Sequence, residues 1–385
     1  MSERDALRFS SIKLTNWKNF AHCDVELEGR VFLVGPNASG KSNFLDAFRF
    51  LRDIASPGGG FQEAVRRRKG VGAIRCLAAR RSPEIELCVR VQPQKGSVQW
   101  TYEVGFNQDK LRRAYVTKER VMHEEKVLIE RPNDEDQQDP DRRTQTHLEQ
   151  VNVNKPFREL AVFFQSIRYL HIVPQLVREP DRSVGRLNDP FGGDFLEQLA
   201  KTSDRTRAAR LRKIRDALRV AVPQLSDIEL QRDERGTPHL HGKYEHWRPQ
   251  GAWQTEEQFS DGTLRLMGLL WVAMETAGPL LLEEPELSLH PEIVQHLPQM
   301  FARMQRRTAR QFILSTHSPD LLRNEGIGLD EVLLLVPGRE GTEVSAAGSL
   351  QEVRKLLEGG LSLDEIVIPK TRPEKAEQLA LFGES

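Results

Sequence analysis

Two adjacent glutamates end an apolar run in the segment LLLEEPELSLHP, which extends from Leu280 to Pro291. A buried carboxylate is costly unless it meets a cation, a water molecule or a proton. Glu283 ends the run and is therefore a candidate metal ligand. Glu284 points to the other side of the strand and is a candidate base for a water molecule. An isolated pair of this kind is more often a pair of exposed loop acids, so the interpretation depends on the rest of the chain.

A complete phosphate-binding pattern, GPNASGKS, lies between a short apolar segment, VFLVG, and an amphipathic one, NFLDAFRFLRDIA. Its glycines allow backbone N–H groups to face phosphate oxygens, its lysine reaches the β- and γ-phosphates, and its serine ligates Mg²⁺. We expect the lysine to be exposed. A neighbouring strand must supply a carboxylate for the metal, so ATP and Mg²⁺ are the predicted cofactors. The predicted phosphate-binding residues are Gly35, Pro36, Asn37, Ala38, Ser39, Gly40, Lys41 and Ser42.

Two further segments narrow the class of phosphate-binding protein. FSDGTLR places Ser260 and Gly262 at the start of a predicted helix, and FILSTHSPD ends an apolar strand at His317. With LTNWKNF before the phosphate loop and EEPELSLHP after the second apolar strand, the chain resembles the ABC ATPases of the RecF/SMC/OLD-like branch. The resemblance covers most of the chain, in the family's order of motifs.

The resemblance implies a role for each motif residue. Glu284 would be the catalytic base, His317 would sense the γ-phosphate, and Glu283 and Gln175 would complete the metal site with Ser42. Ser260 and Gly262 would contact the γ-phosphate held by a second subunit, so that a homodimer would enclose two ATP molecules. Two positions depart from the family pattern: aspartate is commoner than glutamate at 283, and glycine is usual at 38.

The elements that position these residues follow from periodicity. Residues 84–131 alternate with period two, which predicts an antiparallel meander, and helices and strands alternate after Ser260, which predicts a parallel sheet. We expect an α/β fold, an ABC-type ATPase head with a phosphate-loop parallel sheet, an N-terminal antiparallel β lobe and a small helical lobe. The predicted parts are 1–175, 176–255, 256–368 and a tail, 369–385, and the segment DIELQRDERGTPHLHGKYEHW in the second part predicts a hairpin. The polar segment 132–143 is expected to be a mobile loop.

Composition sets limits on partners and compartment. Lys and Arg number 56, as do Asp and Glu, so net charge favours no partner. The three cysteines lie far apart, and neither a secretory signal nor a membrane-spanning segment is expected, so we predict a cytoplasmic protein with no membrane partner. His239, His241 and His246 are interpreted as ordinary surface histidines with no obvious acidic partner.

One basic segment leaves two interpretations open. Residues 201–219 contain eight Lys or Arg and two Asp. They could form a helix that contacts nucleic-acid phosphates through Arg207, Arg210 and Lys213, or a solvated helix face. DNA is therefore a candidate partner.

The expected activity is Mg²⁺-dependent ATP hydrolysis that closes a dimer and drives or licenses a separate effector, such as a nuclease, in DNA metabolism or antiviral defence. The segment between Gln175 and Ser260 is too short for a long coiled-coil arm, and the segment after His317 is too short for a nuclease domain. One alternative is the ATP-binding subunit of a membrane transporter, although FSDGT departs from the usual LSGGQ. The other is an ATP-binding scaffold without turnover, which the presence of Glu284 and His317 disfavours.

Overall fold

The computed structural model describes residues 6–79, 82–94, 96, 99–183, 189, 191–245, 252–275, 278–372 and 378. The chain divides into two compact units. The first unit comprises Met1–Arg168, Ala277–Leu281 and Phe301–Ser385, and the second comprises Tyr169–Thr276 and Leu282–Met300. His246 and most of the predicted tail lie outside the described residues.

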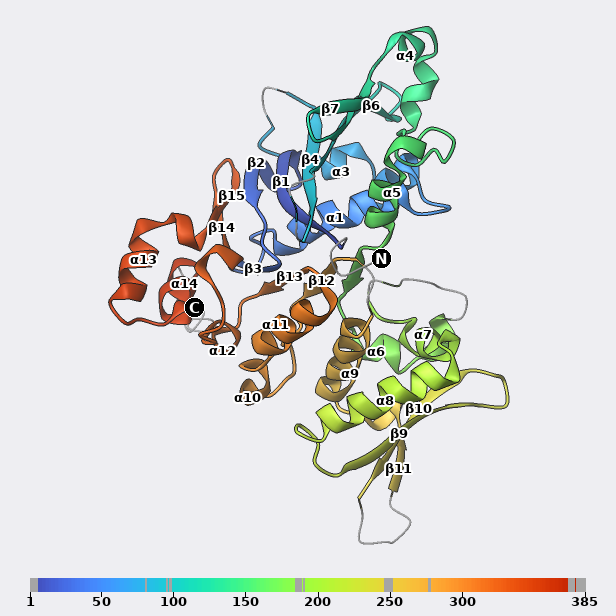
Figure 1. Ribbon diagram of the computed structural model, residues 1–385, viewed down its shortest axis with the longest axis vertical. Helices are drawn as coiled ribbons and strands as arrows, with labels where there is room; N and C mark the ends of the chain where they lie inside the picture. Colours follow the sequence, from blue (N-terminus) through green and yellow to red (C-terminus); the bar gives the residue numbers. More distant parts are fainter. Residues whose placement is uncertain are drawn as a thin grey trace. The chain divides into compact units, whose positions relative to one another are not determined.

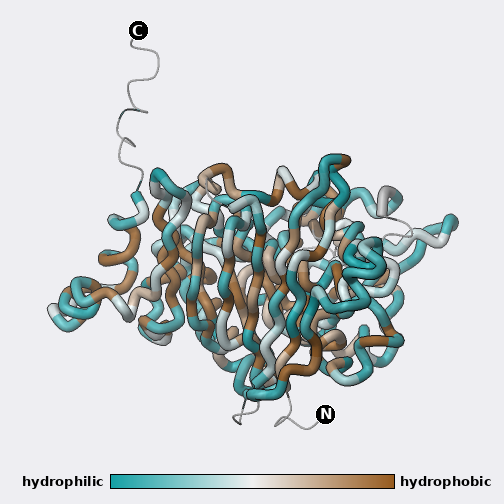
Figure 2. The backbone as a smooth tube through the Cα atoms, turned by 90° about the horizontal axis from the view of Figure 1, so that it is seen from above, coloured by the Kyte–Doolittle hydropathy of each residue, from teal (hydrophilic) through white to brown (hydrophobic). Residues whose placement is uncertain are grey.

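The predicted antiparallel lobe is confirmed as a six-stranded sheet in the first unit, with strand order β2-β1-β4-β5-β6-β7. Along β4 and β5, fully buried residues alternate with partly exposed ones, as expected for a sheet that buries one face. Figure 2 shows this alternation of apolar and polar residues along the extended segments. The strands are β1 (Leu7–Trp17), β2 (Phe20–Glu26), β4 (Ile85–Pro93), β5 (Trp100–Gln108), β6 (Ala114–His123) and β7 (Lys126–Arg131).

A second six-stranded sheet has the order β15-β14-β3-β13-β12-β8. Strands β14, β3 and β13 are parallel, and all five residues of both β3 and β13 are buried. Strands covered on both faces read as continuous apolar runs, which accounts for the runs VFLV and FIL in these strands. The boundary between the units crosses β8 and β12. The strands are β3 (Arg30–Val34), β8 (Arg168–Leu170), β12 (Leu280–Glu283), β13 (Phe312–Thr316), β14 (Val332–Gly338) and β15 (Gly341–Ala346).

Helix α1 (Lys41–Ala55) lies beside the antiparallel sheet (Figure 1) and also contacts β13. Its contacts with the sheet include aromatic side chains. The ring of Phe48 lies 4.7 Å from that of Phe9 in β1, and Phe50 lies 5.3 Å from both Trp17 and Phe106. The helix that begins at the phosphate loop is thus fixed by the core of the lobe. The other helices of this unit are α2 (Phe61–Arg67), α3 (Val71–Ile74), α4 (Asp134–Gln138), α5 (Arg158–Gln165), α12 (Pro319–Leu322), α13 (Gln351–Glu358) and α14 (Leu363–Lys370). Helix α11 (Leu297–Thr308) crosses the unit boundary.

The second unit combines helices with a small antiparallel sheet, β11-β10-β9. The predicted hairpin is confirmed as β9 and β10, and a third strand, β11, extends it. The elements are α6 (Pro174–Val177), α7 (Phe195–Lys201), α8 (Asp204–Leu218), β9 (Leu225–Arg232), β10 (Pro238–Tyr244), β11 (Ala252–Thr255), α9 (Asp261–Ala273) and α10 (Pro291–Val294). In the part of the chain that the structure describes, no helix is both long and apolar enough to cross a membrane.

On helix α8, two of the three cations named for phosphate contacts already have partners within the chain. Arg207 donates to the Asp204 carboxylate at 2.6 Å and to the Thr202 carbonyl, and the Arg210 guanidinium lies 5.1 Å from the centre of the Trp271 ring. Both arginines are therefore engaged by their own unit. Lys213, by contrast, is exposed.

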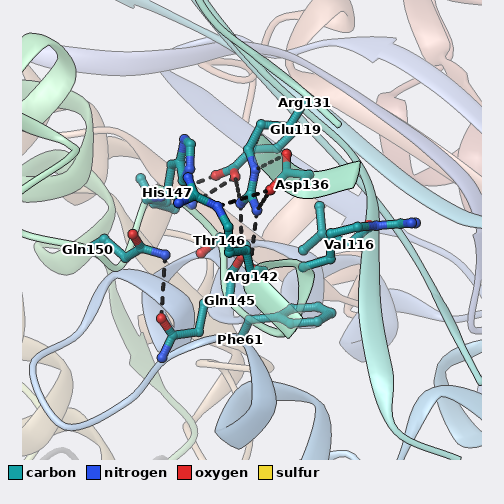
Figure 3. A network of polar contacts seen from close by, with 12 residues as sticks. Phe61, Val116, Glu119, Arg131, Asp136, Arg142, Gln145, Thr146, His147 and Gln150 are labelled. Carbon is teal, nitrogen blue, oxygen red and sulfur yellow. Dashed lines mark hydrogen bonds and ion pairs between the residues drawn. The ribbon is translucent and has the colours of Figure 1, made fainter. Parts of the chain in front are cut away.

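The expectation of a mobile loop over residues 132–143 is wrong. Its residues form α4, whose capping box pairs Asn133 with Asp136, followed by a 3₁₀ turn, Pro140–Thr144. Asp136 is buried and accepts two hydrogen bonds from Arg131, at 2.5 and 2.9 Å (Figure 3). Arg131 also bonds Glu119 of β6 at 3.2 Å. A buried ion pair with complete hydrogen bonding thus orders a segment whose composition alone resembles a linker.

Candidate active site

The phosphate loop directly follows β3, and its two glycines fill positions that a side chain could not. A Cβ atom on Gly35 would lie 2.6 Å from the Leu335 carbonyl oxygen, and one on Gly40 would lie 2.0 Å from Asn19 Nδ2. Gly40 has φ +97° and Ala38 has φ +63°. Position 38 therefore adopts a left-handed conformation that glycine takes without strain, which is a physical reason for glycine being usual there.

Lys41 is the first residue of α1, but the expectation that it is exposed is wrong. It is 7 % exposed, and its Nζ donates to the carbonyl oxygens of Gly35 at 2.8 Å and Pro36 at 3.1 Å. The ammonium group thus lies against the loop it follows. Ser42 is exposed, and the first turn of α1 contains no acidic residue of its own.

Two residues that sequence reasoning missed hold this loop in place. Asn19 Nδ2 and Thr342 Oγ1 both donate to the Ser39 carbonyl oxygen at 2.9 Å, and Asn19 Nδ2 also lies 2.6 Å from Thr342 Oγ1. Asn43 donates to Asn19 Oδ1 at 2.9 Å, which joins the loop to α1. We name Asn19 and Thr342 the loop clamp. Asn19 lies in the segment LTNWKNF but was not singled out there, and no sequence signal indicated Thr342, which lies 323 residues away from it.

The structure brings His317 to the same sheet edge as the phosphate loop. Strands β3 and β13 are parallel neighbours, and Val34 pairs with Thr316. Gly35 and His317 each follow the paired residue, and His317 is exposed. The carboxyl ends of neighbouring parallel strands form the usual ligand-binding edge of an α/β sheet.

Glu283 and Glu284 lie in the second unit, at the end of β12. The Glu283 carboxylate accepts a hydrogen bond from the Tyr169 hydroxyl, and its carbonyl oxygen lies 3.3 Å from His171 Nδ1. Both partners come from the segment that begins in β8, and sequence reasoning did not single them out. Glu284 has φ +44°, a left-handed conformation that is strained for glutamate and that occurs preferentially at functional sites.

A small cavity of about 10 Å³ lies against both glutamates and Arg265 of α9. This volume is close to the minimum that accommodates one water molecule. Burial lowers the pKa of Arg265, and the nearby carboxylates of Asp261 and Glu284 oppose that shift. The cavity therefore has the polar partners that a single ordered water requires.

Ser260 and Gly262, the residues expected to contact the ATP of a second subunit, lie at the start of α9. Ser260 is exposed and caps the helix by accepting from the Thr263 N–H at 3.2 Å. A Cβ atom on Gly262 would lie 2.4 Å from the Ser288 carbonyl oxygen, so glycine allows the helix start to approach the segment that follows Glu284. Gln175 is exposed in the first turn of α6, the position expected after β8.

His239 of β10 has an acidic partner, contrary to expectation. His239 Nδ1 lies 2.7 Å from Glu256, a fully buried carboxylate, which in turn accepts from the Leu240 N–H. Burial lowers the pKa of His239, but this carboxylate outweighs it and the net shift is upward. Among the described residues, no group of three or more His, Cys, Asp or Glu side chains could hold a metal ion.

The residues around the phosphate loop fit ATP and Mg²⁺. Gly35 and Gly40 let the loop approach Leu335 and Asn19 more closely than a Cβ atom would permit, α1 presents its N-terminus, and Ser42 is exposed. Lys41 lies beside the same loop.

Comparisons with known proteins bear on the family and the fold of the chain. The family model described as "AAA domain, putative AbiEii toxin, Type IV TA system" matches residues 30–323, which is more than half of the chain. No curated protein matches significantly in sequence. Among solved structures, a Pyrococcus furiosus Smc head domain with an extended coiled coil, bound to the C-terminal domain of ScpA, has a TM-score of 0.55 at 12 % identity over 92 % of this chain and 99 % of that chain.

Two further Smc heads give similar values. An SmcHead bound to the C-winged helix domain of ScpA has a TM-score of 0.55 at 13 % identity, over 88 % of this chain and 97 % of that chain. A Pyrococcus yayanosii Smc head domain with a coiled coil and joint has a TM-score of 0.51 at 11 % identity, over 92 % and 100 %. The fold is therefore that of an ABC-type, SMC-like ATPase head, as predicted.

Proposed function

This chain belongs to the AAA-domain family described as putative AbiEii toxin of a type IV toxin–antitoxin system, and on that premise we propose that it hydrolyses ATP with Mg²⁺. The observation that carries the proposal is the phosphate loop. It is a glycine-shaped turn between β3 and α1, clamped by Asn19 and Thr342, with His317 at the end of the adjacent parallel strand.

In the proposed reaction, residues Gly35–Ser42 hold the phosphates, and Lys41 exchanges its carbonyl partners for the β- and γ-phosphates. Ser42 and Glu283 would hold Mg²⁺, which would supply positive charge to balance that of the phosphates. Glu284 accepts the proton of the attacking water as the γ-phosphoryl group leaves ADP, and His317 donates to a γ-phosphate oxygen. The Tyr169 hydroxyl orients the Glu283 carboxylate.

Assembly is part of the proposal. Ser260 and Gly262 act on ATP held by a second copy, so that ATP closes a homodimer, and closure drives or licenses a separate effector protein. The exposed, capped start of α9 supports this role for Ser260. Action on DNA or in antiviral defence, with a nuclease as the effector, is the biological setting we propose for this output.

A comparison of Glu284→Gln with Glu283→Gln tests the proposal. The first variant loses the base but keeps its shape, so ATP and Mg²⁺ should bind while phosphate release falls by about 10²–10⁴-fold, and the ATP-bound dimer should accumulate on a sizing column. The second variant loses a charge beside Mg²⁺, so ATP binding should weaken or lose its dependence on magnesium, with no accumulation of dimer.

Glu283→Asp is the matched control, because it keeps the charge and restores the commoner residue. It should retain turnover. If Glu283→Gln traps the dimer while Glu284→Gln only weakens magnesium binding, the two roles are reversed. Unchanged phosphate release in both glutamine variants would contradict the proposed ATPase mechanism.

A further inference from the structure

A large pocket in the first unit lies away from the phosphate loop. It has a volume of about 960 Å³ and is formed by the C-terminal end of α1, the glycine-rich segment 58–60, α2, the β5–β6 turn and residues 145–154. Because α1 starts at the phosphate loop and is 15 residues long, its far end lies about 20 Å from that loop. We call this cavity the α2 pocket. It belongs to neither the phosphate loop nor the clamp.

The charged groups of the α2 pocket are predominantly basic. The cations are Arg66, Lys69, Arg112 and Arg113, against the carboxyl groups of Glu63 and Glu149. Arg66 pairs with Glu63 at 2.7 Å and Arg113 pairs with Asp109 at 2.8 Å. Lys69 and Arg112 are exposed, and neither forms an ion pair within the described ranges of the chain.

Both unpaired cations occupy backbone positions that do not suit them. Lys69 has φ +64° and Arg112 has φ +63°. Glycine or asparagine would adopt these left-handed conformations at lower cost, by about 1 kcal/mol. The placement of long basic side chains at two such turns, both in the lining of one pocket, indicates a role for their charge.

The walls of the pocket are rigid. The Glu149 carboxylate accepts the N–H groups of Phe61 and Thr146, at 2.5 and 3.1 Å, which ties residues 145–150 to the start of α2. Glu119, paired with Arg131, accepts the N–H groups of the next two residues of the same segment (Figure 3). A wall fixed in this way requires little reorganisation when a ligand binds.

The remaining surface suits a polypeptide. Val151 of the lining is 69 % exposed, and Leu111, next to Arg112 in the same turn, is 77 % exposed. A Cβ atom at Gly58 or Gly70 would meet nothing within 4 Å, so another backbone can approach there. Exposed aliphatic side chains beside arginine are typical of protein–protein contacts.

Nucleic acid is the less favoured occupant. Single-stranded nucleic acid commonly stacks its bases on aromatic rings. Phe61 is the one aromatic residue among the described lining residues, and it is fully buried. No ring in that lining is therefore accessible to a base.

We propose that the α2 pocket binds an acidic peptide segment of a partner protein, with an aliphatic side chain of that segment against Val151 and its carboxylates beside Lys69 and Arg112. The proposed function leaves the chemistry of the effector open, and an acidic peptide segment would specify it. Only the consequence of peptide binding rests on the proposed function. Peptide binding is measured without nucleotide. An absence of peptide binding would therefore leave the ATPase proposal unaffected, and an absence of ATP hydrolysis would leave the peptide-binding proposal unaffected.

The experiment compares the wild-type chain with the double variant Lys69→Gly/Arg112→Gly by fluorescence anisotropy. The probe is a short fluorescein-labelled peptide of Glu, Asp and Leu. Glycine suits both backbone positions, so the variant should unfold at the same or a higher denaturant concentration. Its affinity for the peptide should nevertheless fall by about tenfold.

Arg205→Ala/Lys213→Ala in α8 removes the same charge elsewhere and should leave peptide affinity unchanged. A labelled single-stranded oligonucleotide of equal charge should bind the Lys69→Gly/Arg112→Gly variant as tightly as it binds the wild type. Equal loss of peptide affinity in the two double variants, absence of peptide binding to the wild type, or a greater loss of oligonucleotide affinity than of peptide affinity in the Lys69→Gly/Arg112→Gly variant would each overturn the proposal.

Discussion

At the level of single residues, the loop clamp is the feature that most directly connects distant sequence to the phosphate loop. The Ser39 carbonyl oxygen accepts from both clamp side chains, and Thr342 is 4 % exposed. A hydrogen bond of this kind contributes about 1 kcal/mol net. The clamp therefore fixes the direction in which the loop's N–H groups point.

Thr342→Val keeps the shape of the side chain but removes the hydroxyl. Because Asn19 still bonds Ser39, we expect the fold to persist and the dissociation constant for ATP to rise by about three- to tenfold, which corresponds to one lost hydrogen bond. Isothermal titration with ATP and Mg²⁺ measures the change. Thr342→Ser retains the hydroxyl and serves as the control. An affinity that is equal in all three proteins would show that the clamp does not position the loop.

The position of the Lys41 ammonium group could not be predicted from the sequence. The spacing GxxxxGKS identifies the loop, its strand and its helix, because those depend on local backbone requirements. It does not specify where a flexible ammonium group lies, which depends on the carbonyl oxygens that the folded loop offers. For a related reason, the sequence did not reveal Tyr169 as a partner of Glu283 or Thr342 as a partner of Ser39. These contacts join segments that are far apart in the chain, and no local sequence pattern indicates them.

Elements with strong periodicity were predicted correctly, including the β4–β7 meander, the β9–β10 hairpin and the helix–strand alternation after Ser260. The structure of residues 132–143 was not predicted correctly. It depends on hydrogen bonds to Arg131, which also bonds Glu119, and the composition of the segment does not show these partners. His239 was misjudged in the same way, since its partner Glu256 follows a strand of the same sheet that sequence patterning did not reveal.

The wall segment 145–150 contains two groups whose titrations oppose each other. Burial and then Arg131 lower the pKa of His147 to about 4, whereas burial raises the pKa of Glu149 to about 7. Between pH 6.5 and 4, the unfolded chain protonates its histidine before the native protein does, so His147 costs stability as pH falls. Between pH 7 and 4.5, the native protein holds a proton on Glu149 that the unfolded chain has released, so Glu149 adds stability as pH falls.

We therefore expect the two single variants to shift in opposite directions when urea unfolding at pH 5 is compared with pH 8. His147→Gln should gain more stability on acidification than the wild type, and Glu149→Gln should gain less or lose, each by on the order of 1–2 kcal/mol. The wild type should lie between them. Parallel pH profiles for the three proteins would contradict this assignment.

On helix α8, the cations that are available to nucleic acid differ in part from the expected set of Arg207, Arg210 and Lys213. Arg205, Arg212 and Lys213 are exposed, make no ion pair in the described part of the chain and recur at intervals of seven and one, which places them on one helix face. If they contact phosphates, changing all three to Glu should weaken DNA binding equally for all sequences and flatten the salt slope by about one unit per lost contact.

Filter binding over a series of salt concentrations tests this prediction. Arg207→Gln is the control, because that guanidinium already bonds its own unit and should contribute little to DNA binding. An unchanged slope in the triple variant, or no binding by the wild type, would return α8 to the interpretation of a solvated face.

For the whole molecule, the residues assigned to the reaction are divided between the units. The phosphate loop and His317 belong to the first, and Glu283, Glu284 and Ser260 belong to the second. The proposed homodimer adds a further division, because each ATP would use the phosphate loop of one copy and Ser260 of the other. This arrangement can be tested without observing the dimer itself.

Ser260→Asp is the substitution that the structure favours for the test. Aspartate caps a helix as well as serine does, so α9 should persist, but its charge would repel a γ-phosphate. Ser260→Asn keeps the cap without charge and is the matched control. Substitution of Gly262 is unsuitable, because a Cβ atom there would meet Ser288 of the same chain.

Alone, Ser260→Asp should bind ATP normally and release almost no phosphate, and Lys41→Ala should fail to bind ATP. Mixed in equal amounts, they should regain about a quarter of wild-type turnover, because half of the random dimers are mixed and each mixed dimer has one intact site out of two. A steady-state phosphate-release assay measures this recovery. Ser260→Asn should remain active without a partner. If each ATP used only residues of its own chain, the mixture would stay as inactive as its components, and that result would rule out the shared sites.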